Sequence, residues 1–236
     1  MALRILHTND LHGKLTPDIV GPLQTARDSA DFYFDSGDCI KTGNLGLPLS
    51  QEPVWALLHK LNCTASTIGN RETHVLEGAF QAKIAGSRHP LLCANMRRRD
   101  GTLPLGRSLT LESGGLKIGV FGVSVPMVTE KMASKVASAF LWDQPSEIAK
   151  NLCHELRPTV DLLIALTHIG YPKDVALAQS CPEIDIILGG HSHTVIQEPV
   201  REGKTWICQG GSHARFFGLY EWDDGTLTGG LVPWLA

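Results

Sequence analysis

Five short clusters of polar residues carry the side chains that could do chemistry in this chain. They combine histidine, aspartate and asparagine with glycine, and four of them follow directly on an apolar run. The clusters are Asn9–Gly13, Asp35–Asp38, Gly69–His74, Leu166–Gly170 and Gly189–His193. Imidazole nitrogens together with carboxylate and amide oxygens suit divalent first-row metals, whereas the six cysteines contain no C-x-x-C pair. The pattern therefore indicates a metal site built from nitrogen and oxygen ligands.

The spacing within the clusters favours a pair of cations. Asp10 and His12, like His191 and His193, are separated by one residue in a turn, where side chains need not alternate in direction. A carboxylate such as Asp38 can bridge two cations and offset their repulsion. Two metals about 3.5–4 Å apart would acidify a bridging water and clamp the attacking and leaving oxygens of a phosphoryl displacement. The residues thus point to hydrolysis of a phosphoester.

Strands and helices must bring these clusters together. Short apolar runs predict buried strands at 3–7, 31–34, 91–94, 116–123, 162–166, 184–188, 206–208 and 216–222. Segments 52–61 and 145–156 carry Pro near their first turn and apolar residues at helical spacing, which predicts helices. Gly-rich turns at 113–115, 210–211 and 224–225 favour antiparallel hairpins. The alternation predicts an α/β fold with a largely parallel or mixed sheet, whose strand ends face one crevice where ligands collect.

Composition limits the organisation and the partners of the chain. Its 236 residues, 43% of them hydrophobic, can bury one core, so we expect a single domain over 1–236. No run approaches the roughly 18 apolar residues of a membrane span, and no signal-peptide core follows the first Met, so we expect a cytoplasmic protein with no membrane partner. A net charge of −3 provides no overall positive charge that would attract nucleic acid, so we expect no nucleic-acid partner. The six cysteines are expected to be reduced and mostly buried.

The clusters carry a resemblance to a known family. Asp10-x-His12, Gly37-Asp38, Gly69-Asn70-x-Glu72, Thr167-His168 and Gly190-His191-Ser192-His193 resemble, in order, the five motifs of the calcineurin-like metallophosphoesterases. Segment 5–13, Ala94-Asn95 and Gln209 to His213 are similar to the catalytic domain of the 5′-nucleotidase branch. The resemblance implies a four-layer αββα sandwich with mixed sheets and a dinuclear centre at the sheet edges, which the segment around His213 is expected to approach.

The resemblance also implies which side chains hold the metals. One cation would be bound by Asp10, His12, Asp38 and His193, and the other by Asp38, Asn70, His168 and His191. These ligands accept manganese, iron, zinc, nickel or cobalt. The implied activity is hydrolysis of a small phosphorylated substrate, either a phosphomonoester or a phosphodiester, by a hydroxide that bridges the two metals.

Two positions depart from the family pattern. The third motif normally has His after Gly-Asn, and in the nucleotidase branch an Asp orients that His; here Arg71 and His74 occupy the two positions. An arginine stays protonated at neutral pH, so it can support negative charge but is a poor proton donor. We expect Arg71 to support the phosphoryl charge, while His74 or water assists departure of the leaving group. The alternatives are an Arg71 that only closes the site and a His74 that faces solvent or packs.

Two other functions remain open. The same metals could act on another, sulfur-linked ester, or the chain could be a metal-binding regulatory or binding protein with a degenerate catalytic dyad. Nucleotidases of this branch carry a further C-terminal domain that grips the base. The chain ends about where the catalytic domain would finish, so we expect no C-terminal nucleotide-binding domain.

Overall fold

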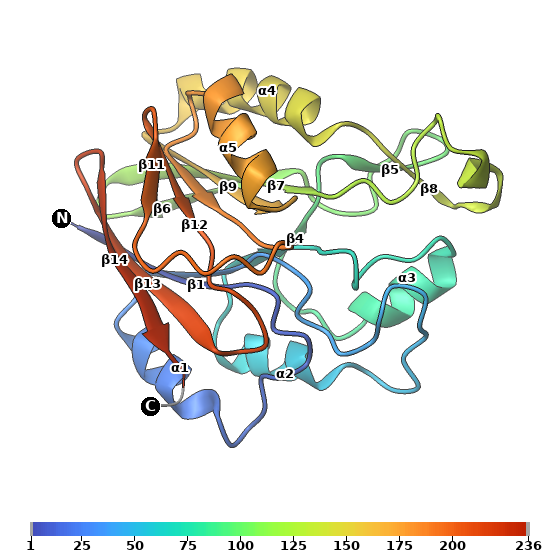
Figure 1. Ribbon diagram of the computed structural model, residues 1–236, viewed down its shortest axis with the longest axis horizontal. Coiled ribbons are helices and arrows are strands. Elements are labelled where there is room, and N and C mark those ends of the chain that lie inside the picture. Colours follow the sequence, from blue (N-terminus) through green and yellow to red (C-terminus); the bar gives the residue numbers. More distant parts are fainter. Residues whose placement is uncertain (1, 235–236) are drawn as a thin grey trace.

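Two mixed sheets packed face to face form the centre of the computed structural model, which describes residues 2–234 (Figure 1). The first sheet has the order β14-β13-β1-β2-β3-β4, and the second has the order β11-β12-β10-β9-β7-β6. The first contains β1 (Leu3–Thr8), β2 (Phe32–Asp35), β3 (Ala65–Thr67), β4 (Leu91–Leu92), β13 (Phe216–Asp223) and β14 (Thr226–Pro233). The second contains β6 (Ser108–Ser113), β7 (Leu116–Ser124), β9 (Leu162–His168), β10 (Ile186–Leu188), β11 (Val200–Glu202) and β12 (Thr205–Cys208). A small antiparallel pair, β5 (Met96–Arg98) and β8 (Phe140–Trp142), lies apart from both.

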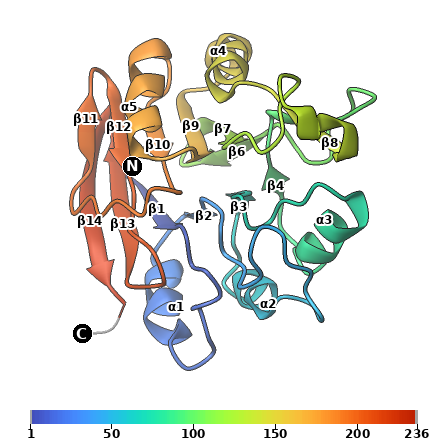
Figure 2. The same cartoon turned by 45° about the vertical axis from the view of Figure 1, so that its right-hand side comes forward.

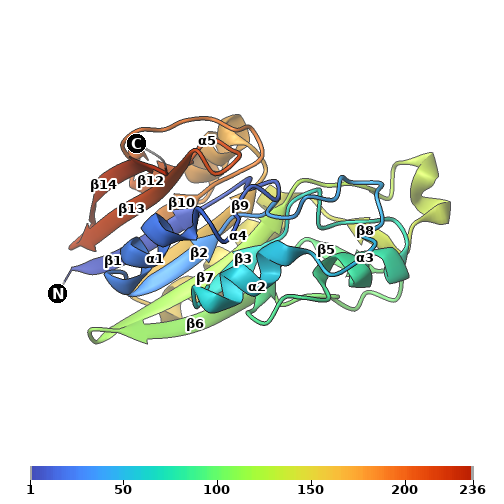
Figure 3. The ribbon, with the colours of Figure 1, turned by 90° about the horizontal axis from the view of Figure 1, so that it is seen from below.

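Helices cover the outer face of each sheet and complete four layers. The core of the first sheet includes residues of α1 (Val20–Asp28), α2 (Pro53–Lys60) and α3 (Glu77–Ile84). The core of the second includes residues of α4 (Pro145–Leu156) and α5 (Tyr171–Ser180). Figure 2 shows α4 and α5 above the sheets and α1 and α2 below them, and Figure 3, seen from below, shows α1 and α2 in front of the strands. Two short 3-10 segments, η1 (Ala133–Ala137) and η2 (Arg157–Thr159), lie in the connections.

Apolar side chains from both sheets fill the space between them. Ile5 and Phe34 from the first sheet share one buried cluster with Ile118 and Ile164 from the second. Neighbouring strands run parallel from β1 to β4 in the first sheet, and from β7 through β9 and β10 to β12 in the second. Because the strands are buried on both faces, they read in sequence as continuous apolar runs, which is why most of them were predictable.

The predicted four-layer mixed α/β architecture is confirmed, with one correction to the connectivity. The turns at 113–115 and 224–225 join β6 to β7 and β13 to β14 as antiparallel hairpins, as expected. The hairpin expected at 210–211 is wrong, because β12 belongs to the second sheet and β13 to the first. The Asn9 side chain accepts a hydrogen bond from Gly210 N and donates one to Gly211 O, so the loop after β1 fixes the crossing between the sheets.

Two further expectations concern the whole chain. Within residues 2–234, all six cysteines are free and buried. None of the helices in this described part of the chain combines the length and the apolar character that crossing a bilayer requires.

Candidate metal centre

Loops at the carboxyl ends of strands from both sheets bring the seven predicted metal ligands together. Asp10 and His12 follow β1, Asp38 follows β2 and Asn70 follows β3. From the second sheet, His168 ends β9, while His191 and His193 follow β10. The convergence expected from parallel strands therefore occurs across two sheets.

The first group of ligand atoms comes from Asp10, His12 and His193. The Nε2 atoms of His12 and His193 lie 2.9 Å apart, and Asp10 Oδ1 lies 3.2 Å from His193 Nε2 and 3.7 Å from His12 Nε2. Two atoms that bind one cation at about 2.0–2.1 Å are roughly 2.9–3.4 Å apart in octahedral or tetrahedral geometry. Asp10 Oδ1 is buried and has no hydrogen-bond partner among residues 2–234, although its neighbours are nitrogens. This donor set fits a divalent cation.

The second group comes from Asn70, His168 and His191. Asn70 Oδ1 lies 2.9 Å from His191 Nδ1 and 3.3 Å from His168 Nε2. Asp38 Oδ1 lies 3.6 Å from His168 Nε2, and the ligand atoms of Asp38, Asp10 and His12 lie within 4.8 Å of one another. Asp38 therefore stands between the two groups, where the resemblance expects a bridging carboxylate.

The electrostatics of the cluster suit metal binding. Burial raises the pKa of Asp38 to about 6, against the lowering effect of His168. Burial lowers the pKa values of His12 and His191 to about 4, which keeps these imidazoles neutral at pH 7. Metal ligation requires neutral imidazoles and ionised carboxylates, and a bound cation favours the ionised carboxylate. The protonation states that burial favours for these imidazoles are thus those of metal ligands.

An unusual backbone conformation is shared by five of the seven predicted ligands. Their φ angles lie between 50° and 79°, in the left-handed region that residues other than glycine rarely adopt. The five residues are Asp10, His12, Asp38, His191 and His193. Such conformations persist only where surrounding structure enforces them, and they gather at functional sites. Here backbone hydrogen bonds hold the loops, since Asp10 N donates to Gly37 O and His12 N donates to Asp38 O.

Glu72, from the third motif, holds the ligand loops in place. Its Oε2 accepts hydrogen bonds from Asp38 N and Gly69 N at 2.9 and 2.8 Å, and its Oε1 accepts one from Ile40 N. The side chain is fully buried. The motif Gly-Asn-x-Glu includes Glu72, but no local pattern indicates that its partners are backbone amides of two loops.

Two supporting residues were not predicted. Gln209 Oε1 accepts hydrogen bonds from Ser192 Oγ and Thr194 N, and its Nε2 donates to Gly190 O, which fixes the loop that carries His191. The buried Nζ of Lys83 lies 2.7–2.9 Å from the carbonyl oxygens of residues 43, 44, 71 and 73. Burial lowers the pKa of Lys83 to about 8, against the raising effect of the nearby carboxylates of Glu72 and Asp38. A buried lysine in a helix that the sequence did not predict could not be identified in advance.

A cavity of about 310 Å³ opens over the two groups of ligand atoms. Of the two residues expected to be catalytic, Arg71 lines this cavity and His74 does not. The residues lining the cavity are His12, Asp38, Gly43, Asn44, Asn70, Arg71, His191, His193 and His213. The guanidinium of Arg71 donates to Lys41 O at 2.8 Å, and Arg71 N donates to Asp38 Oδ1 at 2.7 Å. His74 lies in a different pocket, with Met127 and Trp142, and its Nδ1 accepts a hydrogen bond from Leu76 N. The structure therefore places Arg71 beside the predicted metal ligands and places His74 away from them.

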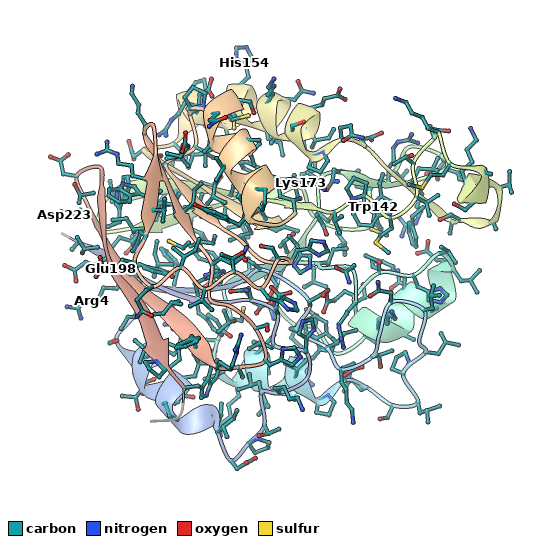
Figure 4. The ribbon with its side chains drawn as sticks, in the orientation of Figure 1. Arg4, Trp142, His154, Lys173, Glu198 and Asp223 are labelled. Atoms are coloured by element: carbon teal, nitrogen blue, oxygen red, sulfur yellow. The ribbon has the colours of Figure 1, made fainter. Side chains whose placement is uncertain are left out.

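Histidines outside the five clusters have other surroundings. His7 is buried in β1, where its Nε2 lies 3.0 Å from Ser36 Oγ, as expected of a core histidine. His154 is exposed on α4, and Figure 4 shows it pointing away from the body of the molecule.

Comparison with known proteins gives matches over nearly the whole chain. The family described as calcineurin-like phosphoesterase matches residues 3–195. A 5′-nucleotidase of Vibrio cholerae is 31% identical over 84% of this chain and 40% of its own length. The uncharacterized metallophosphoesterase YunD of Bacillus subtilis is 27% identical over 93% of this chain and 49% of its own length. The chain thus spans less than half the length of these two relatives.

Solved structures share the fold. A 5′-nucleotidase precursor from Thermus thermophilus matches 99% of this chain and 54% of its own, with a TM-score of 0.78 and 20% identity. The sulfate thiohydrolase SoxB from the same organism matches 99% of this chain and 57% of its own, with a TM-score of 0.81 and 18% identity. At these identities the similarity establishes the architecture alone.

Proposed function

The chain belongs to the calcineurin-like phosphoesterases, and from that premise we propose that it is a dinuclear metal-dependent hydrolase of phosphoric esters. The observation that carries the proposal is the meeting of seven predicted ligands from two sheets, with neighbouring ligand atoms 2.9–3.7 Å apart. The donor set consists of four imidazoles, one amide oxygen and two carboxylates. Such a set suits divalent first-row metals.

Each cation would have its own set of ligands in this arrangement. Asp10, His12 and His193 would hold one, while Asn70, His168 and His191 would hold the other, with Asp38 shared between them. Two bound cations would supply positive charge that polarises the phosphoryl group and lowers the pKa of the attacking water. Glu72 and Gln209 keep the ligand loops in position and so preorganise the site.

Arg71 would bind the phosphoryl group. It lines the cavity above the ligands, and its guanidinium is oriented by the Lys41 carbonyl oxygen. An arginine presents a planar fork of donors that matches phosphoryl oxygens. We propose that Arg71 orients the substrate and neutralises charge that develops on these oxygens, the task that its motif position suggests.

The leaving group would take its proton from water. His74 lies in another pocket, and Arg71 is a poor proton donor. The site is therefore expected to favour esters with acidic leaving groups over esters of simple alcohols. We propose a small phosphorylated molecule as the substrate, since the polar side chains that line the cavity suit a phosphoryl group.

The cysteines support a proposal for the location of the protein. Six buried cysteines without a disulfide fit a reducing compartment such as the cytoplasm, and we propose this location on that ground.

Hydrolysis of p-nitrophenyl phosphate and bis-p-nitrophenyl phosphate tests the proposal. The full chain is assayed with added Mn²⁺, and Asp38→Asn is the control, since it removes the shared carboxylate charge. We expect turnover of at least one substrate that is lost in the variant. Turnover that survives unchanged in Asp38→Asn would contradict the proposal.

Two alternative functions correspond to other outcomes of the same assay. Metal binding without turnover of either substrate would favour a regulatory or binding protein, as the changed dyad at Arg71 and His74 suggests. Turnover of a sulfur-linked ester alone would favour a hydrolase with a different substrate.

A further inference from the structure

A third imidazole lies beside the first pair of predicted metal ligands. The ring centroid of His213 is 4.6 Å from that of His12 and 5.8 Å from that of His193. Ring nitrogens of these three histidines lie within 4.8 Å of one another. His213 comes from the segment that crosses between the sheets after β12, far in sequence from the other two. The resemblance assigns no ligand role to this position.

Distances between the predicted ligands provide an internal standard for His213. The rings of His12 and His193, which would share one cation, have centroids 4.9 Å apart. The rings of His168 and His191, which would share the other, have centroids 5.0 Å apart. Two imidazoles bound through nitrogen to one cation have centroids roughly 4.5–5.5 Å apart for bond angles of 90–120°. His213 meets this standard with His12 and lies just beyond it with His193.

The backbone of His213 is fixed to the same site. Its φ is 61°, in the left-handed region that five predicted ligands also adopt. His213 N donates a hydrogen bond to the carbonyl oxygen of Asp10 at 2.8 Å. That bond connects the main chain of His213 directly to the main chain of a predicted ligand.

The ring of His213 is oriented and accessible. Its Nδ1 lies 2.8 Å from Ser212 Oγ, while the ring lines the cavity over the metal ligands. Histidine ligands commonly use one ring nitrogen for the metal and the other for an orienting hydrogen bond. The Ser212 hydroxyl would serve that purpose here and leave Nε2 for the cation.

We propose that His213 is a third imidazole ligand of the cation held by Asp10, His12 and His193. This inference rests on the proposed dinuclear site and adds to it a ligand that lies outside the five motifs. Three imidazoles at one site favour zinc, cobalt or nickel over manganese, because imidazole suits these metals better. The two sites would then differ in their preferred metal, with the nitrogen-rich site on the side of His12.

Cobalt titration of the metal-free full chain tests the proposal without relying on activity. Co²⁺ binding is followed by calorimetry and by visible absorption, which reports the ligands around cobalt. His213→Phe removes the ligand but keeps a ring, and His213→Asn is a second variant whose side chain tolerates the left-handed backbone. His74→Gln is the matched control, since it removes a histidine of the other pocket.

The expected result separates the two cobalt sites. Wild type and His74→Gln bind two Co²⁺ with the same spectrum, while both His213 variants weaken one site at least about tenfold and change its absorption. Zinc-edge X-ray absorption should show fewer imidazoles per zinc in the His213 variants only. Unchanged affinity and spectrum in both variants would overturn the ligand role of His213 and leave the dinuclear centre intact. Failure of wild type to bind two metals would overturn the dinuclear centre itself.

Discussion

Arg71 and His74 come from the same cluster, yet the structure gives them different surroundings. Arg71 lines the cavity over the metal ligands, and its backbone N donates to the proposed bridging carboxylate, Asp38. His74 accepts a hydrogen bond from Leu76 N in a neighbouring pocket. Of the two substitutions in the third motif, only that at Arg71 changes the chemistry available at the centre.

Replacing Arg71 should therefore lower activity, while replacing His74 should not. For Arg71→Ala we expect a decrease in kcat/KM for p-nitrophenyl phosphate of roughly 10²–10³-fold, the loss seen when one donor to a developing charge is removed. For His74→Ala we expect a change smaller than about twofold, because the side chain lies outside the cavity. Steady-state kinetics of both variants with saturating Mn²⁺ checks this. A large loss in His74→Ala would restore that residue as a participant.

The predicted metal ligands were the residues of the candidate site that the sequence made easiest to find. Asp10, Asp38 and His191 stand where apolar runs end, and a chain of buried strands leaves its polar side chains at those ends. Lys83 and Gln209 were not predictable in the same way, because their contacts are with carbonyl oxygens and loops distant in sequence. Side chains that hold a distant loop in place do not produce a recognisable spacing pattern in the sequence.

At the scale of elements, the predicted helices were those with clear amphipathic patterns. Segments 52–61 and 145–156 correspond to α2 and α4. Helices α1, α3 and α5 were missed; α1 and α3 contain glycine, and α1 also contains Pro22, so the local propensity of these two for helix is low. Packing stabilises them instead: Phe80 of α3 is fully buried in the core of the first sheet. Tertiary contacts of this kind are invisible in a local pattern.

Lys83 of α3 contacts the loop that carries the predicted ligand Asn70, and this gives a second prediction. Lys83→Met keeps much of the apolar stem but leaves four carbonyl oxygens without the ammonium. We expect the free energy of unfolding to fall by about 2–4 kcal/mol, as for other buried polar groups that lose a charged partner. Two of these oxygens belong to Arg71 and Thr73, next to Asn70, so affinity for the second metal should also weaken.

Urea unfolding and metal titration of the variant provide the measurement. Lys60→Met is the matched control, because Lys60 is exposed at the end of α2. Equal stability of the two variants would show that the ammonium does not hold these loops.

The loop after β2 packs against the loop after β3, and this contact gives a third prediction. Gly37 has φ of 84°, and a Cβ there would clash with the backbone of Gly69. We expect Gly37→Ala to destabilise the protein by about 2–4 kcal/mol, through both the strained φ and the clash. A Cβ at Gly21 in α1 would have no neighbour within 4 Å. Because alanine favours a helix more than glycine does, Gly21→Ala should stabilise the protein by about 0.5–1 kcal/mol.

Thermal unfolding of the two alanine variants compares these effects directly. Opposite signs of the change in Tm are expected. If Gly37→Ala is as stable as wild type, the close approach of the two loops is not required for folding.

For the molecule as a whole, the predicted metal ligands come from both sheets. Asp10, Asp38 and Asn70 come from the first sheet, whereas His168 and His191 come from the second. Each proposed cation is therefore bound by residues of both sheets. Metal binding would stabilise the packing of the sandwich in addition to serving the reaction.

Removal of metal should consequently lower thermal stability. A ligand at 100 times its Kd stabilises the native state by about 2.7 kcal/mol, which corresponds to roughly 5–10 °C in Tm for a chain of this size. We expect this decrease when wild type is treated with a chelator, and recovery when Mn²⁺ or Zn²⁺ is restored. In Asp38→Asn the change should be much smaller. Calorimetry with and without chelator checks it, and equal Tm values for wild type would contradict metal binding at this site.

The layered architecture was predictable because all five motifs resembled one family in order, and each motif ends a strand. The path of the chain between sheets was less predictable. Gly210 and Gly211 predict a hairpin turn, yet the next strand, β13, belongs to the other sheet. Hydrogen bonds from this segment to Asn9 and Asp10 hold it beside β1 instead. The partner of a strand depends on contacts between distant segments, which local turn signals do not specify.

The pairing of β1 with β13 has a consequence for how the protein is made. Leu3 lies opposite Trp222 and His7 opposite Gly218, so one neighbour of the first strand is synthesised more than 200 residues later. During translation β1 can pair with β2 early, but its other edge stays open until residue 223 has left the ribosome. Completion of the first sheet, and with it the seating of the segment that carries His213, therefore waits until every strand of the second sheet has been synthesised.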